Sequence, residues 1–431
     1  MNRLEELRSY MEKEGLDGFY IAKPANVRCI SAYTGDDSYL FIDKANQYFI
    51  TDPRYTEQAS MECPDYEIIN WRSTGIGNVI AELCKKDGIK TIGFEQDHLT
   101  FATWRSMQDT IDAELVPTLN VVERFREVKT PEEIQKLRVS CDIASRAFDK
   151  ILQDIKVGVT EKELASRLSH YMVMEGADTK PYGGILISGP KTSLLHGIPG
   201  NRALEYGDFV LMDYGCQYDG YLSDMTRTVV VGKATPKQKE VYNICRQMTE
   251  DVEATIKPGV TGEDCYQASL KAIEGTEYMP YNYTGIGHGV GLFVHELPFI
   301  GKNHTDVLQA GSVMTVEPGI YIPGWGGVRI EDQGIITEDG YENLISATHE
   351  LIEGGRLMKK RVLAAFLSMA MVAGLATGCG TPGGGKSDGD SADGKVFRYA
   401  VNTLPTTLDP TKGQSIGDNE IQHAITEGLT R

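Results

Sequence analysis

Three short segments in the middle of the chain occur twice, and the two copies of each are separated by nearly the same number of residues. The paired segments are KVGVTE at 156–161 and KPGVTG at 257–262, HGIP at 196–199 and HELP at 295–298, and VLMDYG at 210–215 and MTVEPG at 314–319. Such a repeat indicates a domain built from two similar halves that pack against each other. The first pair also predicts local structure, because each copy follows one helical stretch and caps the next.

Each half carries two acidic residues at matching places. An apolar strand ends in an acid, a turn containing glycine follows, and a second strand brings another acid: Asp213 and then Asp224 in the first half, Glu317 and then Glu331 in the second. If the halves fold face to face, the four carboxylates converge. Converging carboxylates repel one another in a partly dry site unless a cation neutralises them. The repeat therefore predicts a metal site.

His288 adds a nitrogen ligand to this set. It lies in the glycine-rich segment GHGVG at 287–291, where the backbone can approach closely and an imidazole can point inward. A donor set that is mostly oxygen with one nitrogen favours Mn²⁺ or Co²⁺ over a thiolate-rich zinc site. Five ligands, of which two carboxylates can bridge, suit two divalent metal ions roughly 3.5 Å apart.

Residues 1–122 predict a separate α/β domain. Short aromatic or β-branched runs bounded by turn residues alternate there with segments of helical periodicity. Near residue 130 the pattern changes, because Thr130, Pro131 and Glu133 form a helix start with a capping box. The apolar stripe that follows continues to Ile155 and predicts a long amphipathic helix that opens a second domain, residues 123–355. The predicted N-terminal strands are 19–22, 39–42, 48–50 and 91–94, and the predicted helices are 2–14, 53–61 and 76–87.

Composition restricts partners and compartment. The chain has 43 Lys and Arg against 61 Asp and Glu, a formal charge of -18, which opposes nucleic-acid binding. Its 8 cysteines include no C-x-x-C pair, so a reducing compartment is expected. The charged amphipathic start is unlike a secretion signal, and we expect the enzyme body to be cytoplasmic, with no membrane association.

Residues 356–431 have a different character. Met358 and a short basic stretch precede an apolar run at 362–375 and then Cys379, an order typical of a bacterial lipoprotein signal. The Gly, Ser and Asp-rich stretch at 380–394 predicts disorder. Residues 358–431 resemble the opening of an oligopeptide-binding lipoprotein of an ABC transporter. We interpret 356–431 as an extension fused from a neighbouring reading frame; the alternative is a tethering helix that belongs to the enzyme.

The repeat region resembles the creatinase, or pita-bread, metallopeptidases, and within them the Xaa-Pro aminopeptidase and Xaa-Pro dipeptidase (prolidase) branch. The resemblance covers about 1–355 and implies an α/β N-terminal domain followed by an α+β pita-bread catalytic domain with an internal pseudo-twofold repeat. In this family a homodimer is common. The segments that carry the resemblance are MDYG at 212–215, SDMTRT at 223–228, GHGVG at 287–291, HELP at 295–298, VEPG at 316–319 and GVRIED at 327–332.

The resemblance also implies how the ligands are shared. Asp213 would bind one metal ion, His288 and Glu317 would bind the other, and Asp224 and Glu331 would bridge the two. A hydroxide between the metal ions would attack the scissile carbonyl.

Four further assignments follow from the resemblance. Glu317 would carry a proton to the leaving imino nitrogen, His196 and His295 would flank the substrate, and Arg329 would orient Glu331. Thr284 departs from the family pattern, since many Xaa-Pro members carry a histidine there.

The expected function is a peptidase that hydrolyses the bond before proline in small peptides. One alternative is a metal-free peptide- or protein-binding module on the same fold, which would require lost ligands, and all five are present. Another is a general aminopeptidase similar to the methionine aminopeptidases, which usually lack the N-terminal domain. A peptide-capture lipoprotein is a third reading, but the extension lacks the body of a binding domain.

Overall fold

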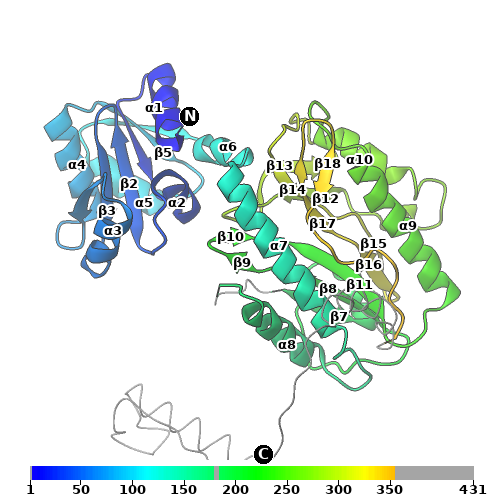
Figure 1. The fold of residues 1–431 in the computed structure, drawn as a ribbon. Coiled ribbons are helices and arrows are strands. Elements are labelled where there is room, and N and C mark those ends of the chain that lie inside the picture. Colours follow the sequence, from blue (N-terminus) through cyan, green and yellow to red (C-terminus); the bar gives the residue numbers. More distant parts are fainter. Residues whose placement is uncertain (1, 179–183, 355–431) are drawn as a thin grey trace, which may run out of the picture. The chain divides into compact units, whose positions relative to one another are not determined.

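The computed structural model describes residues 2–178 and 184–354. The predictions made for residues 356–431, including the signal-like segment and its disorder, lie outside the described residues. The chain begins with a six-stranded sheet in the order β4-β3-β2-β1-β5-β6, in which β1 pairs antiparallel with β2 and parallel with β5 (Figure 1). Its strands are β1 (Gly18–Ile21), β2 (Ser38–Asp43), β3 (Gln47–Thr51), β4 (Glu67–Asn70), β5 (Thr91–Glu95) and β6 (Glu114–Thr118).

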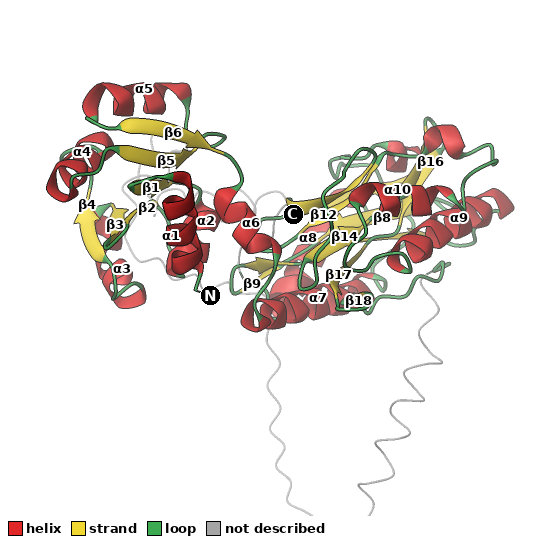
Figure 2. Cartoon of the chain, turned by 90° about the horizontal axis from the view of Figure 1, so that it is seen from above, coloured by secondary structure: helices red, strands yellow, loops and turns green. Residues whose placement is uncertain are grey.

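Helices cover both faces of this sheet (Figure 2). Because successive strand residues point to opposite faces, Phe19 packs with α1 and α2, whereas Tyr20 packs with α4 and α5. This two-sided burial explains the nearly continuous apolar strands. The helices are α1 (Arg3–Glu14), α2 (Pro24–Ser31), α3 (Thr56–Glu62), α4 (Ile76–Asp87), α5 (Phe101–Thr110) and α6 (Val121–Glu127).

The predicted N-terminal elements are confirmed within one or two residues, except that the segment predicted as helix 53–61 begins with a 3₁₀ turn at Pro53–Tyr55. Five helices and strands were not predicted: α2, β4, α5, β6 and α6. Strand β4 has exposed or half-buried residues, and β6 contains Pro117, so neither has the strong apolar pattern of a central strand.

The region from Pro131 onward consists of two halves with a similar order of elements (Figure 1). In each half two helices precede the strands, and a two-stranded hairpin lies in the chain between two strands that pair with each other. The first half contains α7 (Pro131–Ile151), α8 (Glu161–Met174), β7 (Ile185–Ser188), β8 (Phe209–Tyr214), β9 (Gln217–Tyr218), β10 (Tyr221–Leu222) and β11 (Met225–Val230). The second contains α9 (Pro236–Glu253), α10 (Gly262–Leu270), β12 (Gly285–Gly289), β13 (Glu296–Gly301), β14 (Val313–Val316), β15 (Gly319–Ile322), β16 (Gly326–Arg329), β17 (Asp332–Ile336) and β18 (Tyr341–Asn343).

This order confirms the predicted pseudo-twofold repeat. In the first half β8 pairs with β11 and the hairpin β9–β10 lies between them in the chain. In the second half β14 pairs with β17, and the hairpin β15–β16 lies between them. An antiparallel bridge between Thr226 and Glu331 joins the two halves. The acid-bearing strands of both halves therefore meet along one line.

Capping boxes start the helices of both halves, as the repeated segments predict. Thr160 caps α8 and Thr261 caps α10, each through its side-chain oxygen and an acid three residues later. Thr130 caps α7 in the same way. Helix α7 ends at Ile151, so Ile155, the last residue of the predicted stripe, is buried in the turn beyond it.

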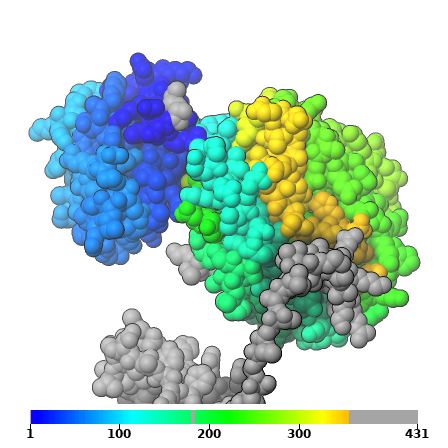
Figure 3. All heavy atoms as spheres, in the orientation of Figure 1, coloured from blue at the N-terminus to red at the C-terminus, as the bar shows by residue number. Residues whose placement is uncertain are grey.

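Helix α7 lies beside the segment that follows β17 on the surface of the domain (Figure 3). Arg138 of α7 pairs with Glu342 of β18, and the Ser346 amide donates to the Ser145 hydroxyl at 3.1 Å. The end of the described chain is therefore fixed to the first helix of this domain. Among the helices of the described residues, none has the length and apolar character needed to cross a bilayer.

Candidate metal centre

The five predicted metal ligands come from both halves and line one cavity of about 410 Å³. The sheet register brings them together. Asp213 lies opposite Thr226 in the β8–β11 pair, and Thr226 in turn bridges to Glu331. In the second half Val316 lies opposite Asp332 in the antiparallel pair of β14 and β17. Glu317 follows Val316 and Glu331 precedes Asp332, so the two carboxylates lie at the same end of this strand pair. Asp224 immediately precedes β11, and His288 lies in β12.

His288 presents its Nε2 atom to the carboxylates. Its Nδ1 atom lies 3.0 Å from the Gly289 carbonyl oxygen, a contact that places the proton on Nδ1 and leaves the Nε2 lone pair free for a cation. Nε2 lies 3.7 Å from Asp224 Oδ2 and 3.3 Å from Glu317 Oε1. Ligand atoms of Asp224, His288 and Glu331 all lie within 4.8 Å of one another.

Burial changes the proton affinity of these groups. Burial, followed by repulsion from Asp224 and Glu317, raises the pKa of Glu331 well above its usual range. Burial also raises the pKa of Glu317 to about 7, against the opposing effect of Arg329. The His288 pKa is lowered by burial, which favours a neutral imidazole. Carboxylates that would otherwise retain protons, next to a neutral imidazole, fit divalent cations that take oxygen and imidazole ligands.

Arg329 is buried and contacts the centre differently from the expectation. Its Nη2 atom forms an ion pair with Asp213, and its Nη1 atom donates to the Tyr321 hydroxyl at 2.7 Å. Its link to Glu331 runs through Thr226: Arg329 Nε donates to Thr226 Oγ1 at 3.0 Å, and Thr226 Oγ1 donates to Glu331 Oε2 at 2.6 Å. Its Nε atom also lies 3.9 Å from Glu317 Oε2, so Arg329 faces Asp213 and Glu317 directly and reaches Glu331 through a hydroxyl group.

His196 and His295 lie at the same cavity, and both are exposed. His196 follows the 3₁₀ helix Gly189–Ser193, and His295 immediately precedes β13. The His295 ring lies edge-on to the His288 ring, with centroids 4.4 Å apart. Partial burial of the ring and the neighbouring His288 lower the pKa of His295, which favours the neutral imidazole, a form that can both donate and accept a hydrogen bond.

Several residues at the centre were not assigned from the sequence. Thr226 and Tyr321 support Arg329, and Gln333 accepts a hydrogen bond from the Asp224 amide at 2.8 Å. Thr226 lies inside the SDMTRT segment at 223–228, so the motif that carries the family resemblance already pointed to it. Tyr321 and Gln333 lie on apolar strands, where no local sequence pattern marks them as part of the site. The apolar part of the cavity wall is made by Ile185, Leu195, Tyr283, Val294 and Phe299.

Comparisons with known proteins agree with this architecture. Residues 135–338 match metallopeptidase family M24, and residues 3–128 match the creatinase/prolidase N-terminal domain. The uncharacterized peptidase YqhT of Bacillus subtilis is 40% identical over 351 residues, covering 81% of this chain and 99% of that protein.

Two solved structures are similar in fold and sequence. The Xaa-Pro dipeptidase from Bacillus anthracis has a TM-score of 0.79 and 39% identity, covering 81% of this chain and 99% of its own. The X-Pro aminopeptidase from Thermotoga maritima has a TM-score of 0.76 and 32% identity, covering 82% of this chain and 100% of its own. The five proposed ligands come from both halves of the repeat and line one cavity. Together with the family matches, this shows that the chain belongs to metallopeptidase family M24 and carries the creatinase/prolidase N-terminal domain.

Proposed function

We propose that this chain is a peptidase with two divalent metal ions that hydrolyses the bond before proline in small peptides. The observation that carries the proposal is the convergence of five donor side chains from both halves of the repeat in one cavity. Similarity to proteins named Xaa-Pro dipeptidase and X-Pro aminopeptidase supports the substrate class.

The proposed ligands are those predicted from the sequence. Divalent cations at this site, Mn²⁺ or Co²⁺ by the donor chemistry, would supply an activated water near neutral pH and would polarise the scissile carbonyl. One ion would be held by Asp213, the other by His288 and Glu317, with Asp224 and Glu331 shared between them.

The chain's own side chains then have distinct tasks. Glu317, whose pKa is raised to about 7, can take a proton and pass it to the leaving imino nitrogen. His196 and His295, at the same cavity, can hydrogen-bond the substrate carbonyl and stabilise the oxyanion that develops from it. Arg329 holds Asp213 in place through their ion pair.

Selectivity for proline is the sharpest test of this proposal. The apolar cavity wall that includes Tyr283 and Phe299 suits a pyrrolidine ring. With the Mn²⁺-loaded full chain, we expect Ala-Pro substrates to be cleaved at least about tenfold faster than matched Ala-Ala substrates, a difference of about 1.4 kcal/mol in transition-state binding. Equal rates would identify a general aminopeptidase, and no hydrolysis of either with metal bound would favour a binding module.

The same assay separates dipeptidase from aminopeptidase activity. Rates on Leu-Pro and on Leu-Pro-Xaa peptides of matched composition give the preferred substrate length, and repeating the comparison with Co²⁺ gives the metal preference.

A further inference from the structure

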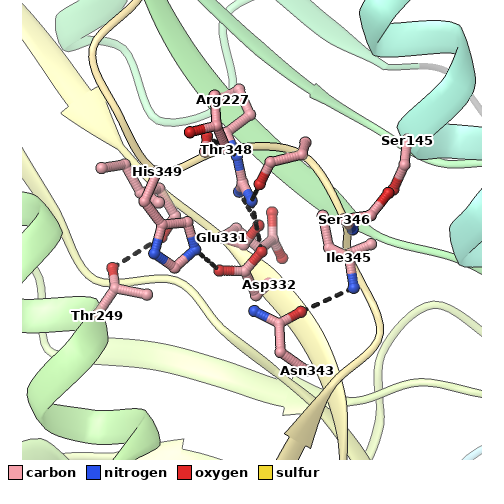
Figure 4. A network of polar contacts seen from close by, with 12 residues as sticks. Ser145, Arg227, Thr249, Glu331, Asp332, Asn343, Ile345, Ser346, Thr348 and His349 are labelled. Carbon is pink, nitrogen blue, oxygen red and sulfur yellow. Dashed lines mark hydrogen bonds and ion pairs between the residues drawn. The ribbon is translucent and has the colours of Figure 1, made fainter. Parts of the chain in front are cut away.

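A buried ionic network contacts the backbone at Glu331 (Figure 4). At its centre the Arg227 guanidinium pairs with Asp332, with Nη2 2.6 Å from Oδ1, and the two side chains are 1% and 0% exposed. His349 completes the network through a contact between its Nε2 atom and Asp332 Oδ2. We call Arg227, Asp332 and His349 the Arg227 network.

The Arg227 network binds the backbone on which Glu331 is mounted. Arg227 Nη1 donates to the Glu331 carbonyl at 2.7 Å and to the Thr226 carbonyl at 2.9 Å. Asp332, the next residue, is the other partner of the same guanidinium. The peptide that joins Glu331 to Asp332 is therefore held both at its carbonyl oxygen and through the side chain that follows it.

The network also connects this peptide to a distant segment of the chain. Arg227 donates to the carbonyl oxygens of Ala347 at 2.8 Å and Thr348 at 3.1 Å, and His349 follows them. Since all three nitrogens of the guanidinium have acceptors, Arg227 can occupy only this position without leaving buried donors unpaired.

A second metal site is the competing interpretation of this cluster. Ligand atoms of Glu253, Asp332 and His349 lie within 4.8 Å of one another. However, the Arg227 guanidinium already supplies a positive charge to Asp332 within hydrogen-bond distance. The other carboxylate oxygen of Asp332, Oδ2, contacts His349 Nε2, so both oxygens of Asp332 and the Nε2 atom of His349 already have partners within the network. The geometry therefore favours a structural connection over a second ion site.

We propose that the Arg227 network positions Glu331 for metal binding, so that His349, from the last described segment, contributes to the metal centre without touching it. The inference rests on the proposed function, because it requires Glu331 to bind metal. Contacts behind a ligand fix its orientation, and their loss typically costs about 10–100-fold in metal affinity or activity. Of the three members, His349 is the best choice for substitution, because its side chain is 21% exposed whereas those of Arg227 and Asp332 are buried.

The test compares His349→Ala and His349→Gln in the full chain. Glutamine keeps an N–H group that can donate to Asp332, whereas alanine has none. Glu350→Gln is the matched control, since Glu350 is the next residue and pairs with Arg246 at the surface. Mn²⁺ affinity is measured by calorimetry on the metal-free protein, well below each variant's Tm, and kcat and KM are measured on Ala-Pro substrates.

We expect His349→Ala to weaken Mn²⁺ binding about tenfold or more and to lower kcat more than it raises KM. His349→Gln should recover most of the loss, and Glu350→Gln should match the parent. If His349→Ala lowers Tm but leaves Mn²⁺ affinity unchanged, the network is only structural and the inference is wrong. Asp332→Asn, which keeps the volume but removes the charge, should repeat the weaker Mn²⁺ binding; parental affinity in this folded variant would also contradict the inference.

Asp224→Asn in the same series separates this inference from the proposed function. If Asp224→Asn loses Mn²⁺ while His349→Ala keeps it, only the positioning role fails. If Asp224→Asn also binds Mn²⁺ as the parent does, the proposed metal site itself fails.

Discussion

At the scale of single residues, the centre is a balance of buried charges. Asp224, Glu331 and Glu317 lie together. Arg329 pairs with Asp213, lies 3.9 Å from Glu317 Oε2 through its Nε atom, and reaches Glu331 through the Thr226 hydroxyl. One guanidinium cannot neutralise four carboxylates. Burial first, and repulsion between the carboxylates second, raise the pKa of Glu331 and of Glu317, and bound divalent cations would favour the ionised form of both.

This balance predicts the effect of changing Asp224. We expect Asp224→Asn to remove most bound Mn²⁺ and nearly all turnover, because an amide oxygen without a net charge is a poor replacement for a carboxylate between two cations. Metal content after dialysis, measured by atomic emission, and the rate on Ala-Pro check this. Asp109→Asn is the control, since Asp109 is exposed on α5, where it pairs with Arg105. Two metal ions per chain with a near-normal rate in Asp224→Asn would contradict the assignment.

At the scale of elements, the repeat places the same capping device before α8 and α10. The Thr160 side chain accepts from the Glu163 amide, and the Thr261 side chain accepts from the Asp264 amide. Each helix packs on the strands of its own half: α8 on β7, and α10 on β13. The caps thus stabilise helices that pack against the strands, and the two cap residues are not among those that line the cavity of the proposed ligands.

The caps can therefore be weakened without removing metal. Thr160→Ala and Thr261→Ala should each lower the free energy of unfolding by about 0.5–2 kcal/mol, because each leaves a helix N-terminal amide without its acceptor. Chemical denaturation of the metal-free protein measures the loss, and Mn²⁺ content should equal that of the parent. Loss of Mn²⁺ in either variant would show that the placement of these helices affects metal binding.

At the scale of the molecule, the described chain ends by closing its own fold. The segment after β18 binds Arg227 through its backbone, and Glu353 forms a parallel bridge with Val230 at the end of β11. All five proposed ligands and every strand of the described residues precede this bridge.

Truncation tests this view of the whole chain. A protein that ends at Leu357 should keep the kcat on Ala-Pro and the Mn²⁺ content of the full chain, because every proposed ligand and every strand of the described residues is retained. We also expect higher solubility, since the apolar run at 362–375 is removed. Steady-state kinetics and metal analysis on both proteins measure the difference. A large fall in kcat would show that the extension belongs to the enzyme and that the fused-frame interpretation is wrong.

The sequence by itself determined the two-domain plan and the repeat, and it predicted the five proposed ligands that line one cavity. These are encoded locally: Thr160 and Thr261 mark helix starts, and the acids stand where apolar strands end, so periodicity and capping suffice to find them. It did not reveal β4 or β6, whose residues are too exposed or too irregular for a strand pattern.

Only the tertiary structure decided which residues support the donors. Arg329 pairs with Asp213 and reaches Glu331 through the Thr226 hydroxyl, although Glu331 is only two residues away. The reason is that Arg329 ends β16, and the β8–β11 register places Asp213 opposite Thr226, so that both side chains come within reach of the guanidinium. The contact between His349 and Asp332 likewise depends on tertiary packing. It forms because β17 packs against the segment that follows β18, and no local sequence pattern encodes that contact.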